Sequence, residues 1–152
     1  DGYTVMVYSA TIVANAHLYK KLPYDALKDF IGIAPIARLV GVLVVHPSLP
    51  VRTVKDLIAL AKSRPGQISY SSSGNGGTAH LAGLMLQTMM GLALLHVPYR
   101  GSGPAVVDVA AGRIDIMFDA VPSLLPMIQA GKLRPLAAAS DGAATTPRRR
   151  IA

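Results

Sequence analysis

The stretch Ser69-Tyr-Ser-Ser-Ser-Gly-Asn-Gly-Gly-Thr-Ala-His80 decides the fold of this chain. A β-prone run over 67–72 ends in a glycine-rich turn, and the turn opens directly onto an amphipathic helix pattern over 79–90. Glycines let the backbone approach a ligand closely, and the first N–H groups of a helix have no partner within it. These donors and the positive end of the helix dipole attract a carboxylate or a phosphate. The stretch therefore predicts an anion-binding turn.

Strands and helices alternate around this turn. The capping-box pattern Thr53-Val-Lys-Asp56 predicts a helix over 54–63, which Pro65-Gly66 ends. The pattern then predicts strands at 67–72, 94–97, 114–118 and 133–138, separated by helices at 79–90, 104–111 and 122–130. This alternation is typical of a mostly parallel sheet with helices on both faces, so we expect an α/β fold.

The first part of the chain predicts further strands. The runs Tyr3–Tyr8, Ile31–Leu39 and Val42–His46 are apolar and are too short or too aperiodic for helices. A short helix pattern at 15–20 and a proline turn at 22–25 connect the first two runs.

The composition indicates one folded domain, or one domain and part of another. Of 152 residues, 51% are hydrophobic and 15% are charged, which argues against disorder. No apolar stretch approaches the roughly 20 residues of a membrane span. The chain opens on Asp1-Gly2 without a recognisable signal peptide, so we expect it to begin inside a longer protein.

The basic charge does not predict a nucleic-acid partner. The net charge is +7, but the only basic cluster is Arg148 to Arg150, and aromatic residues make up only 5% of the chain. That cluster lies in a compositionally distinct tail, 141–152, which is either a solvated end, as we expect, or an interaction arm that binds polyanions. The absence of cysteine excludes disulfides and thiolate metal sites.

The glycine spacing leaves a second interpretation open. Gly74-Asn-Gly-Gly-Thr-Ala79 satisfies the dinucleotide-binding pattern G-x-G-x-x-G/A between a strand and a helix. That pattern expects an acidic residue after the next strand to hold the ribose, and Val97-Pro-Tyr-Arg100 contains none. A dinucleotide-binding enzyme domain is therefore the alternative to a carboxylate-binding protein.

No catalytic, metal or cofactor site is expected. Ser71 to Ser73 lack a G-x-S-x-G elbow, and no acid is placed to orient His80, which we expect to pack or to face water. The four histidines lack the spacing of a metal site. Asp119 follows a strand at the edge where α/β sheets bind ligands, so it either contacts a ligand or caps the helix near Pro122.

Six segments in order resemble the substrate-binding proteins of tripartite tricarboxylate transporters, the Bug-type receptors. They are Leu22-Pro-Tyr-Asp25 with Asp29-Phe30, Pro65-Gly66 leading to Tyr70-Ser-Ser-Ser-Gly74, Gly77-Thr-Ala-His-Leu81, Val97-Pro-Tyr-Arg-Gly101, Ala111-Gly112 with Ile114-Asp115, and Ala130-Gly-Lys-Leu-Arg134 with Leu136-Ala137.

The resemblance implies a periplasmic receptor with two lobes of the type II periplasmic-binding-protein kind that close on a small carboxylate, without catalysis. Membrane components of a tripartite transporter are the implied partners. The resemblance places the ligand on a set of strand ends and turns, with the backbone N–H groups of the last two glycines and the threonine as donors. The implied ligand residues are Ser9, Thr11, Ser73, Gly74, Asn75, Gly76, Gly77, Thr78, Tyr99 and Asp119.

Members of this family are about twice as long as this chain, which sets the expected domain organisation. Residues 1–41 are expected to be part of the first lobe, 42–140 the second α/β lobe, and 141–152 the basic tail. Half of a two-lobed receptor cannot close on its ligand. We therefore expect weak or absent ligand binding by this chain alone, and self-association through uncovered apolar surface.

Overall fold

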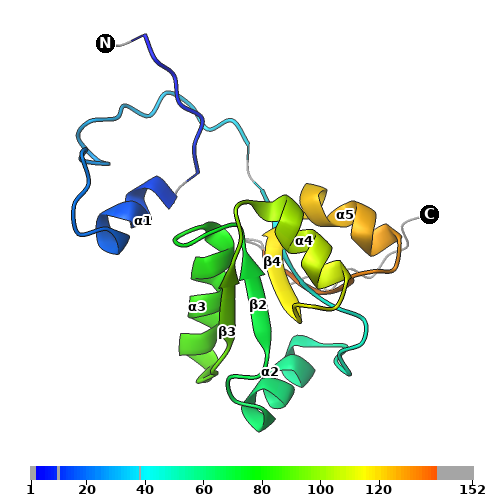
Figure 1. Cartoon of the computed structure of the whole chain (residues 1–152). Coiled ribbons are helices and arrows are strands. Elements are labelled where there is room, and N and C mark those ends of the chain that lie inside the picture. The colour runs from blue at the N-terminus through cyan, green and yellow to red at the C-terminus, as the bar shows by residue number, and fades with distance from the viewer. Residues whose placement is uncertain (1–2, 10, 38, 140–152) are drawn as a thin grey trace. The chain divides into compact units, whose positions relative to one another are not determined.

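The computed structural model describes residues 3–9, 11–37 and 39–139 (Figure 1). The chain divides into two compact units, residues 1–37 and 38–152. Gly41, which the sequence assigns to the first lobe, begins strand β1 (Gly41–Val45) of the second unit. The assignment of the two units to two lobes remains a prediction, and the predicted tail 141–152 lies outside the described residues.

The first unit contains one helix among its described residues, α1 (Thr11–Leu18). This helix begins and ends earlier than the predicted span 15–20. The side-chain amide of Asn15 donates to the Tyr24 hydroxyl at 3.0 Å, and the Tyr24 and Phe30 rings meet edge to face at 5.4 Å. These contacts connect α1 to the turn that follows it.

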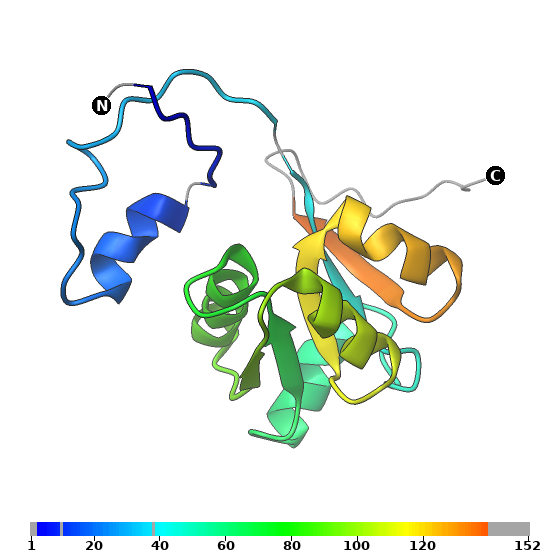
Figure 2. The ribbon, with the colours of Figure 1, turned by 45° about the horizontal axis from the view of Figure 1, so that its top comes forward.

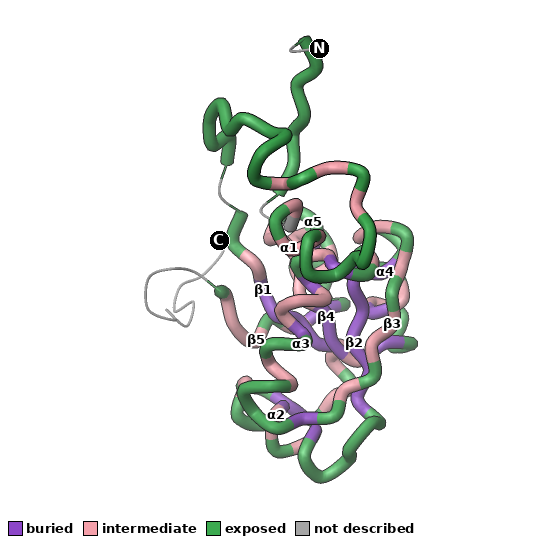
Figure 3. The backbone as a smooth tube through the Cα atoms, turned by 90° about the vertical axis from the view of Figure 1, so that its left-hand side faces the viewer, coloured by how far each residue is buried: buried purple, intermediate pink, exposed green. Residues whose placement is uncertain are grey.

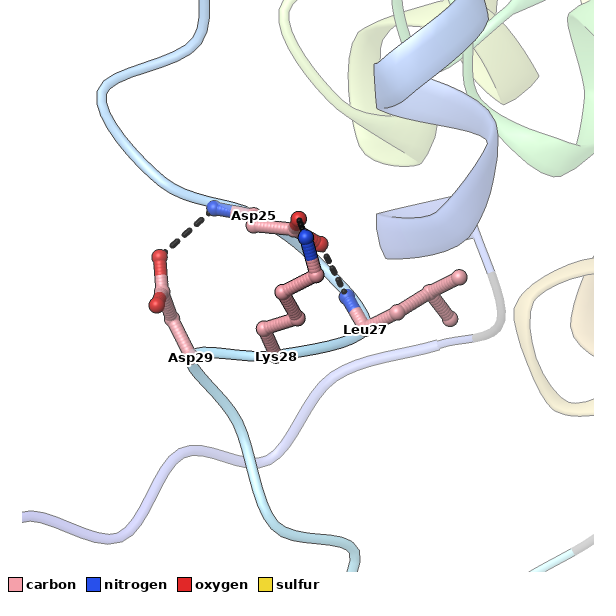
Figure 4. Close-up of polar contacts among 4 residues, drawn as sticks. All are labelled: Asp25, Leu27, Lys28 and Asp29. Carbon is pink, nitrogen blue, oxygen red and sulfur yellow. Dashed lines mark hydrogen bonds and ion pairs between the residues drawn. The ribbon is translucent and has the colours of Figure 1, made fainter.

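Asp25 organises that turn, as Figure 4 shows. Its backbone N–H donates to Asp29 Oδ2 at 2.6 Å, while its own Oδ1 accepts the Leu27 N–H at 3.0 Å. The Lys28 ammonium lies 3.3 Å from Asp25 Oδ2. The hydrogen bond from the Leu27 N–H is the largest cause of the lowered pKa of Asp25. The turn predicted at 22–25 is thus extended by an Asp that bonds to the backbone two residues on.

The two apolar runs of the first part are not strands, which corrects the prediction. Residues 3–8 and the described residues of 31–39 are exposed, and neither run joins the sheet of the described chain. β-Propensity reflects the fit of a side chain to neighbouring strands, so apolar composition alone does not form a strand.

The second unit contains the nine remaining elements of the described chain, and every element predicted from residue 42 onward is present in it. The elements after β1 are α2 (Val54–Ser63), β2 (Ser69–Ser72), α3 (Thr78–Met90), β3 (Leu95–Pro98), α4 (Ser102–Ala110), β4 (Ile116–Ala120), α5 (Val121–Gln129) and β5 (Arg134–Ala139). The observed bounds of α2 coincide with the predicted ones.

The five strands form one sheet in the order β3-β2-β4-β1-β5. β2 pairs in parallel with β3 and β4, whereas β1 pairs antiparallel with β4 and with β5. The predicted α/β fold is confirmed, but the sheet is mixed, because β1 runs opposite to the other four strands. The first strand of the unit is therefore inserted between two strands that come much later in the sequence.

Helices cover both faces of this sheet, and each face has its own apolar core (Figures 1 and 2). Alternate residues of β1 divide between the two: Val42 and Val44 pack with α4 and α5, whereas Leu43 and Val45 pack with α2 and the Tyr70 side chain. Figure 3 shows that the buried residues are concentrated in the central strands. Burial on both faces explains the continuous apolar sequence of β1.

Candidate functional site

Three parallel strands end at one edge of the sheet, and each leads into a helix. β2 leads into α3, β3 into α4 and β4 into α5 (Figure 2). The first two turns are bonded together, because the Tyr99 N–H donates to the Ser72 carbonyl at 3.0 Å and the Gly101 N–H donates to the Ser73 carbonyl at 3.1 Å. The glycine turn and the loop after β3 therefore form one continuous rim.

The helices that begin at this edge carry no capping side chain. Their N-cap residues are Gly77, Gly101 and Ala120, and none of the three has an acidic residue in its first turn. Helix α2 follows β1, which is antiparallel to β4 and therefore ends at the opposite edge of the sheet. Unlike the three helices above, α2 has a capped N-terminus, because Thr53 and Asp56 form a capping box. Uncapped N–H groups and three helix dipoles concentrate positive potential at one edge, which favours an anion.

Within the glycine turn, two of the three predicted backbone donors are already engaged. The Gly76 N–H donates to His80 Nδ1 at 3.0 Å, and the Gly77 N–H donates to the Gly74 carbonyl at 3.3 Å. The N–H groups of Thr78 and Ala79 open α3 and have no acceptor within the described part of the chain. The role of the Gly76 and Gly77 N–H groups toward a ligand stays a prediction, and the structure adds Ala79 beside Thr78 as a donor without an acceptor.

The residues of the glycine turn differ in their exposure. Ser73, Asn75 and Thr78 are exposed, whereas Gly76 is buried. The backbone of Gly76 has φ of +76°, a conformation that side-chain-bearing residues rarely adopt. A glycine is needed there for the turn, and the three polar side chains remain available to a ligand.

Tyr99 takes part in this rim through its backbone N–H, which bonds to Ser72, and not through its hydroxyl. Its Oη donates to Asp108 Oδ2 at 2.6 Å, and Asp108 also pairs with Arg113 at 2.6 Å. Burial, together with the bond to Asp108, raises the pKa of Tyr99 to about 12. The same bond, followed by the bond from Arg113, lowers the pKa of Asp108. The phenol is thus neutral and held by α4.

Asp119 lies near the end of β4 and does not cap α5. Its Oδ1 accepts the N–H of Ala120 at 2.7 Å, but the N-cap of α5 is Ala120. Its Oδ2 is buried and has no hydrogen-bond partner among the described residues. Of the two roles that the sequence left open, ligand contact is the one that remains a proposal.

The predicted residues Ser9 and Thr11 belong to the first unit. Ser9 is exposed, and its carbonyl accepts the Ile12 N–H at 3.2 Å. Thr11 begins α1. Their role toward a ligand stays a prediction.

A column of three rings beneath the glycine turn was missed by the sequence interpretation. The Tyr70 and His96 rings stack at 4.8 Å between centroids, and the His96 and His80 rings stack at 4.1 Å with 9° between their planes. His96 Nε2 lies 2.7 Å from the Ser72 hydroxyl. The sequence could have indicated the Tyr70–His96 contact, because parallel pairing of the two predicted strands 67–72 and 94–97 sets Tyr70 opposite His96.

Metal ligands and membrane-spanning helices also bear on the kind of site. Among the described residues, no group of three or more His, Cys, Asp or Glu side chains could hold a metal ion. No helix in the same part of the chain is both long enough and apolar enough to cross a membrane.

Residues 1–148 match the family model described as "Tripartite tricarboxylate transporter family receptor". This chain belongs to that family. It is 35% identical over 147 residues to Protein BugT of Bordetella pertussis, a match that covers 95% of this chain and 45% of BugT. The resemblance to Bug-type receptors is therefore confirmed, and the dinucleotide-binding alternative is not favoured.

Solved structures show the same fold. "R. palustris Rpa4515 with adipate" is 40% identical with a TM-score of 0.76, over 81% of this chain and 41% of that one. "Structure of a periplasmic transporter" is 43% identical with a TM-score of 0.79, over 86% of this chain and 44% of that one. The family is one of periplasmic solute receptors, and this chain spans less than half the length of the relatives it matches.

Proposed function

We propose that this chain forms a carboxylate-holding part of a periplasmic solute receptor that serves a tripartite tricarboxylate transporter. The observation that carries the proposal is the edge at which three uncapped helices begin, next to exposed Ser73, Asn75 and Thr78. Family membership and the adipate-bound relative support a carboxylate as the anion. The chain then acts as a binding protein rather than an enzyme, with the membrane components of the transporter as its partners.

The proposed contact is between one ligand carboxylate and the backbone N–H groups of Thr78 and Ala79. Both groups are free of acceptors within the described chain, and the helix dipole adds to their attraction. Each charge-assisted hydrogen bond contributes about 1.5–3 kcal/mol. Asp119 Oδ2, buried without a partner among described residues, would accept a hydrogen bond from a hydroxyl or amino group of the ligand.

A titration with adipate followed by backbone amide NMR tests this proposal on the chain itself. Weak binding is expected, with the largest shift changes at Thr78, Ala79 and the rim of the glycine turn. Adipamide, the uncharged diamide of adipate, serves as the control ligand and should leave these amides unshifted. The proposal fails if adipate leaves the edge unchanged, or if adipamide shifts it equally.

Proline at the first helical position removes one donor without breaking the helix. Gly77 has φ −69° and ψ 164°, which is compatible with a following proline. We expect Thr78→Pro to weaken adipate binding by roughly tenfold or more, the loss of one charge-assisted bond. Val54→Pro makes the same change at the first position of α2, after Thr53 with φ −134° and ψ 163°, and should leave binding unchanged.

A further inference from the structure

His80 holds the glycine turn through a hydrogen bond that defines its protonation state. The Gly76 N–H donates to His80 Nδ1 at 3.0 Å. An imidazole nitrogen that accepts a hydrogen bond carries no proton, so a neutral His80 has its proton on Nε2. Protonation of His80 would place a second N–H against the N–H of Gly76. The bond that fixes the turn therefore exists only while His80 is neutral.

His96 supports the same turn from the neighbouring strand. The Ser72 hydroxyl donates to the Gly74 carbonyl at 3.0 Å and accepts the Gly74 N–H at 3.2 Å. His96 Nε2 lies 2.7 Å from the same hydroxyl, within hydrogen-bond distance. His96 and His80 thus contact the turn at both of its ends, through Ser72 and through Gly76.

The stacking of the two histidines makes charging of both unfavourable. Their centroids are 4.1 Å apart, and burial together with the neighbouring His80 lowers the pKa of His96. Like charges at this distance disfavour each other. His96 lies between His80 and Tyr70 in the stack, and His80 is the ring that bonds to the Gly76 N–H.

The elements packed against α3 offer no acid to stabilise a charged His80. Helix α3 is in contact with β2, β3 and β4. Among the ionisable side chains, β2 carries only Tyr70 and β3 only His96, while α3 has none besides His80. β4 carries Asp119, which pairs with Val42 and so lies on the other face of the sheet.

We propose that neutral His80 is a positioning residue of the carboxylate site, which holds the glycine turn in its binding form through Gly76, and that protonation of His80 releases the turn. The inference rests on the proposed function for its effect on the ligand, but the effect on the turn is independent of any ligand. Acid is then expected to weaken carboxylate binding, because release of the turn displaces the N–H groups at the start of α3.

The first experiment follows the turn without ligand in the full 152-residue chain. Ring nitrogen shifts in NMR should show the proton of His80 on Nε2 near neutral pH. The protection of the Gly76 amide from hydrogen exchange, corrected for the intrinsic rate, should fall by roughly tenfold on acidification through the range where histidines charge. A proton on Nδ1, or constant protection, would overturn the proposal.

The variant His80→Asn separates the hydrogen bond from the charge. Asn offers a carbonyl oxygen near the position of Nδ1 but does not titrate. We expect it to retain Gly76 protection at every pH, whereas His80→Ala should lose protection at every pH. His46→Asn, a histidine of the same unit that bonds to Ser48, should keep the wild-type pH profile. A profile in His80→Asn that matches wild type would also overturn the proposal.

The second experiment adds adipate. The affinity of wild type divided by that of His80→Asn cancels any protonation of adipate itself, and this ratio should fall by roughly tenfold between neutral and acid pH. A constant or rising ratio overturns the role of His80 in binding. If adipate binds to neither protein at any pH, the proposed function fails, while the Gly76 measurement still decides whether His80 positions the turn.

Discussion

At the scale of single residues, the packing of α3 onto the sheet depends on one missing side chain. Gly83 lies inside α3, where glycine is otherwise unfavourable. A Cβ at this position would lie 2.3 Å from Cε2 of Tyr70, whose side chain is fully buried. The Tyr70 ring stacks on His96, and His96 stacks on His80. The absence of a side chain at Gly83 therefore allows the ring column to form beneath the glycine turn.

Gly83→Ala should destabilise the protein by about 1–3 kcal/mol, the usual cost of overpacking a filled core. The loss follows because the fully buried Tyr70 ring has no exposed side toward which to move. Gly103→Ala is the matched control: Gly103 also lies within a helix, but a Cβ there would have open space around it, so that variant should be neutral or slightly stabilising. Urea unfolding compares the two, and equal effects would contradict the packing argument.

At the scale of elements, α2 shows what local sequence determines. Thr53 Oγ1 accepts the Asp56 N–H at 3.1 Å, and Asp56 Oδ2 accepts the Thr53 N–H at 2.9 Å. Thr53→Ala should cost about 0.5–2 kcal/mol of stability, the usual effect of removing an N-cap. Thr88→Ala, which removes an exposed bond from the Thr88 hydroxyl to the Leu84 carbonyl within α3, should cost little or nothing. A larger loss at Thr88 in thermal unfolding would contradict this account.

The same element explains why the helices were predictable from the sequence and part of the sheet was not. The capping box, the helix period and the Pro65-Gly66 stop are local signals, and α2 was predicted to the residue. The place of β1 between β4 and β5 depends on pairing with residues far away in the chain, for which no local signal exists. The same reason explains the error at Tyr3–Tyr8 and Ile31–Leu39, where apolar runs have no partner strand in the described sheet.

The candidate site was predicted in outline only. The strand–turn–helix order located the turn and its exposed polar residues, because glycine spacing is visible in sequence. The bond from Gly76 to His80 was not predictable, since it depends on a ring rotation within the first turn of α3. That bond engages the N–H of Gly76 and leaves those of Thr78 and Ala79 without an acceptor in the described chain.

At the scale of the whole molecule, exposed apolar side chains predict self-association. Met85 and Met89 lie one turn apart on α3 and are 63% and 69% exposed, and Leu95 on the edge strand β3 is 55% exposed. Large apolar side chains exposed to this extent favour contact between copies. The double variant Met85→Gln with Met89→Gln should reduce the association measured by sedimentation at high concentration. Ala59→Gln on the exposed side of α2 should not, and a wild-type monomer at all concentrations would contradict the prediction.

The pH dependence of stability should have two steps. The lowered pKa of His96 means that, below the ordinary value of 6.5, the unfolded chain binds a proton that the folded chain does not, so stability falls as the pH drops below 6.5. The lowered pKa values of Asp56 and Asp108 produce a second loss of stability at lower pH. Their contribution is present above the ordinary value of 3.8 and is lost as the pH falls below it.

His96→Gln should shrink the first step and leave the second unchanged. Glutamine can still donate to the Ser72 hydroxyl from its side-chain amide, but it does not titrate. His17→Gln, at an exposed histidine of the first unit, is the control and should retain both steps. Thermal unfolding of the three proteins across this range is the measurement. A first step of full size in His96→Gln would contradict the prediction, because it would show that the burial of His96 carries no energetic penalty for its charge.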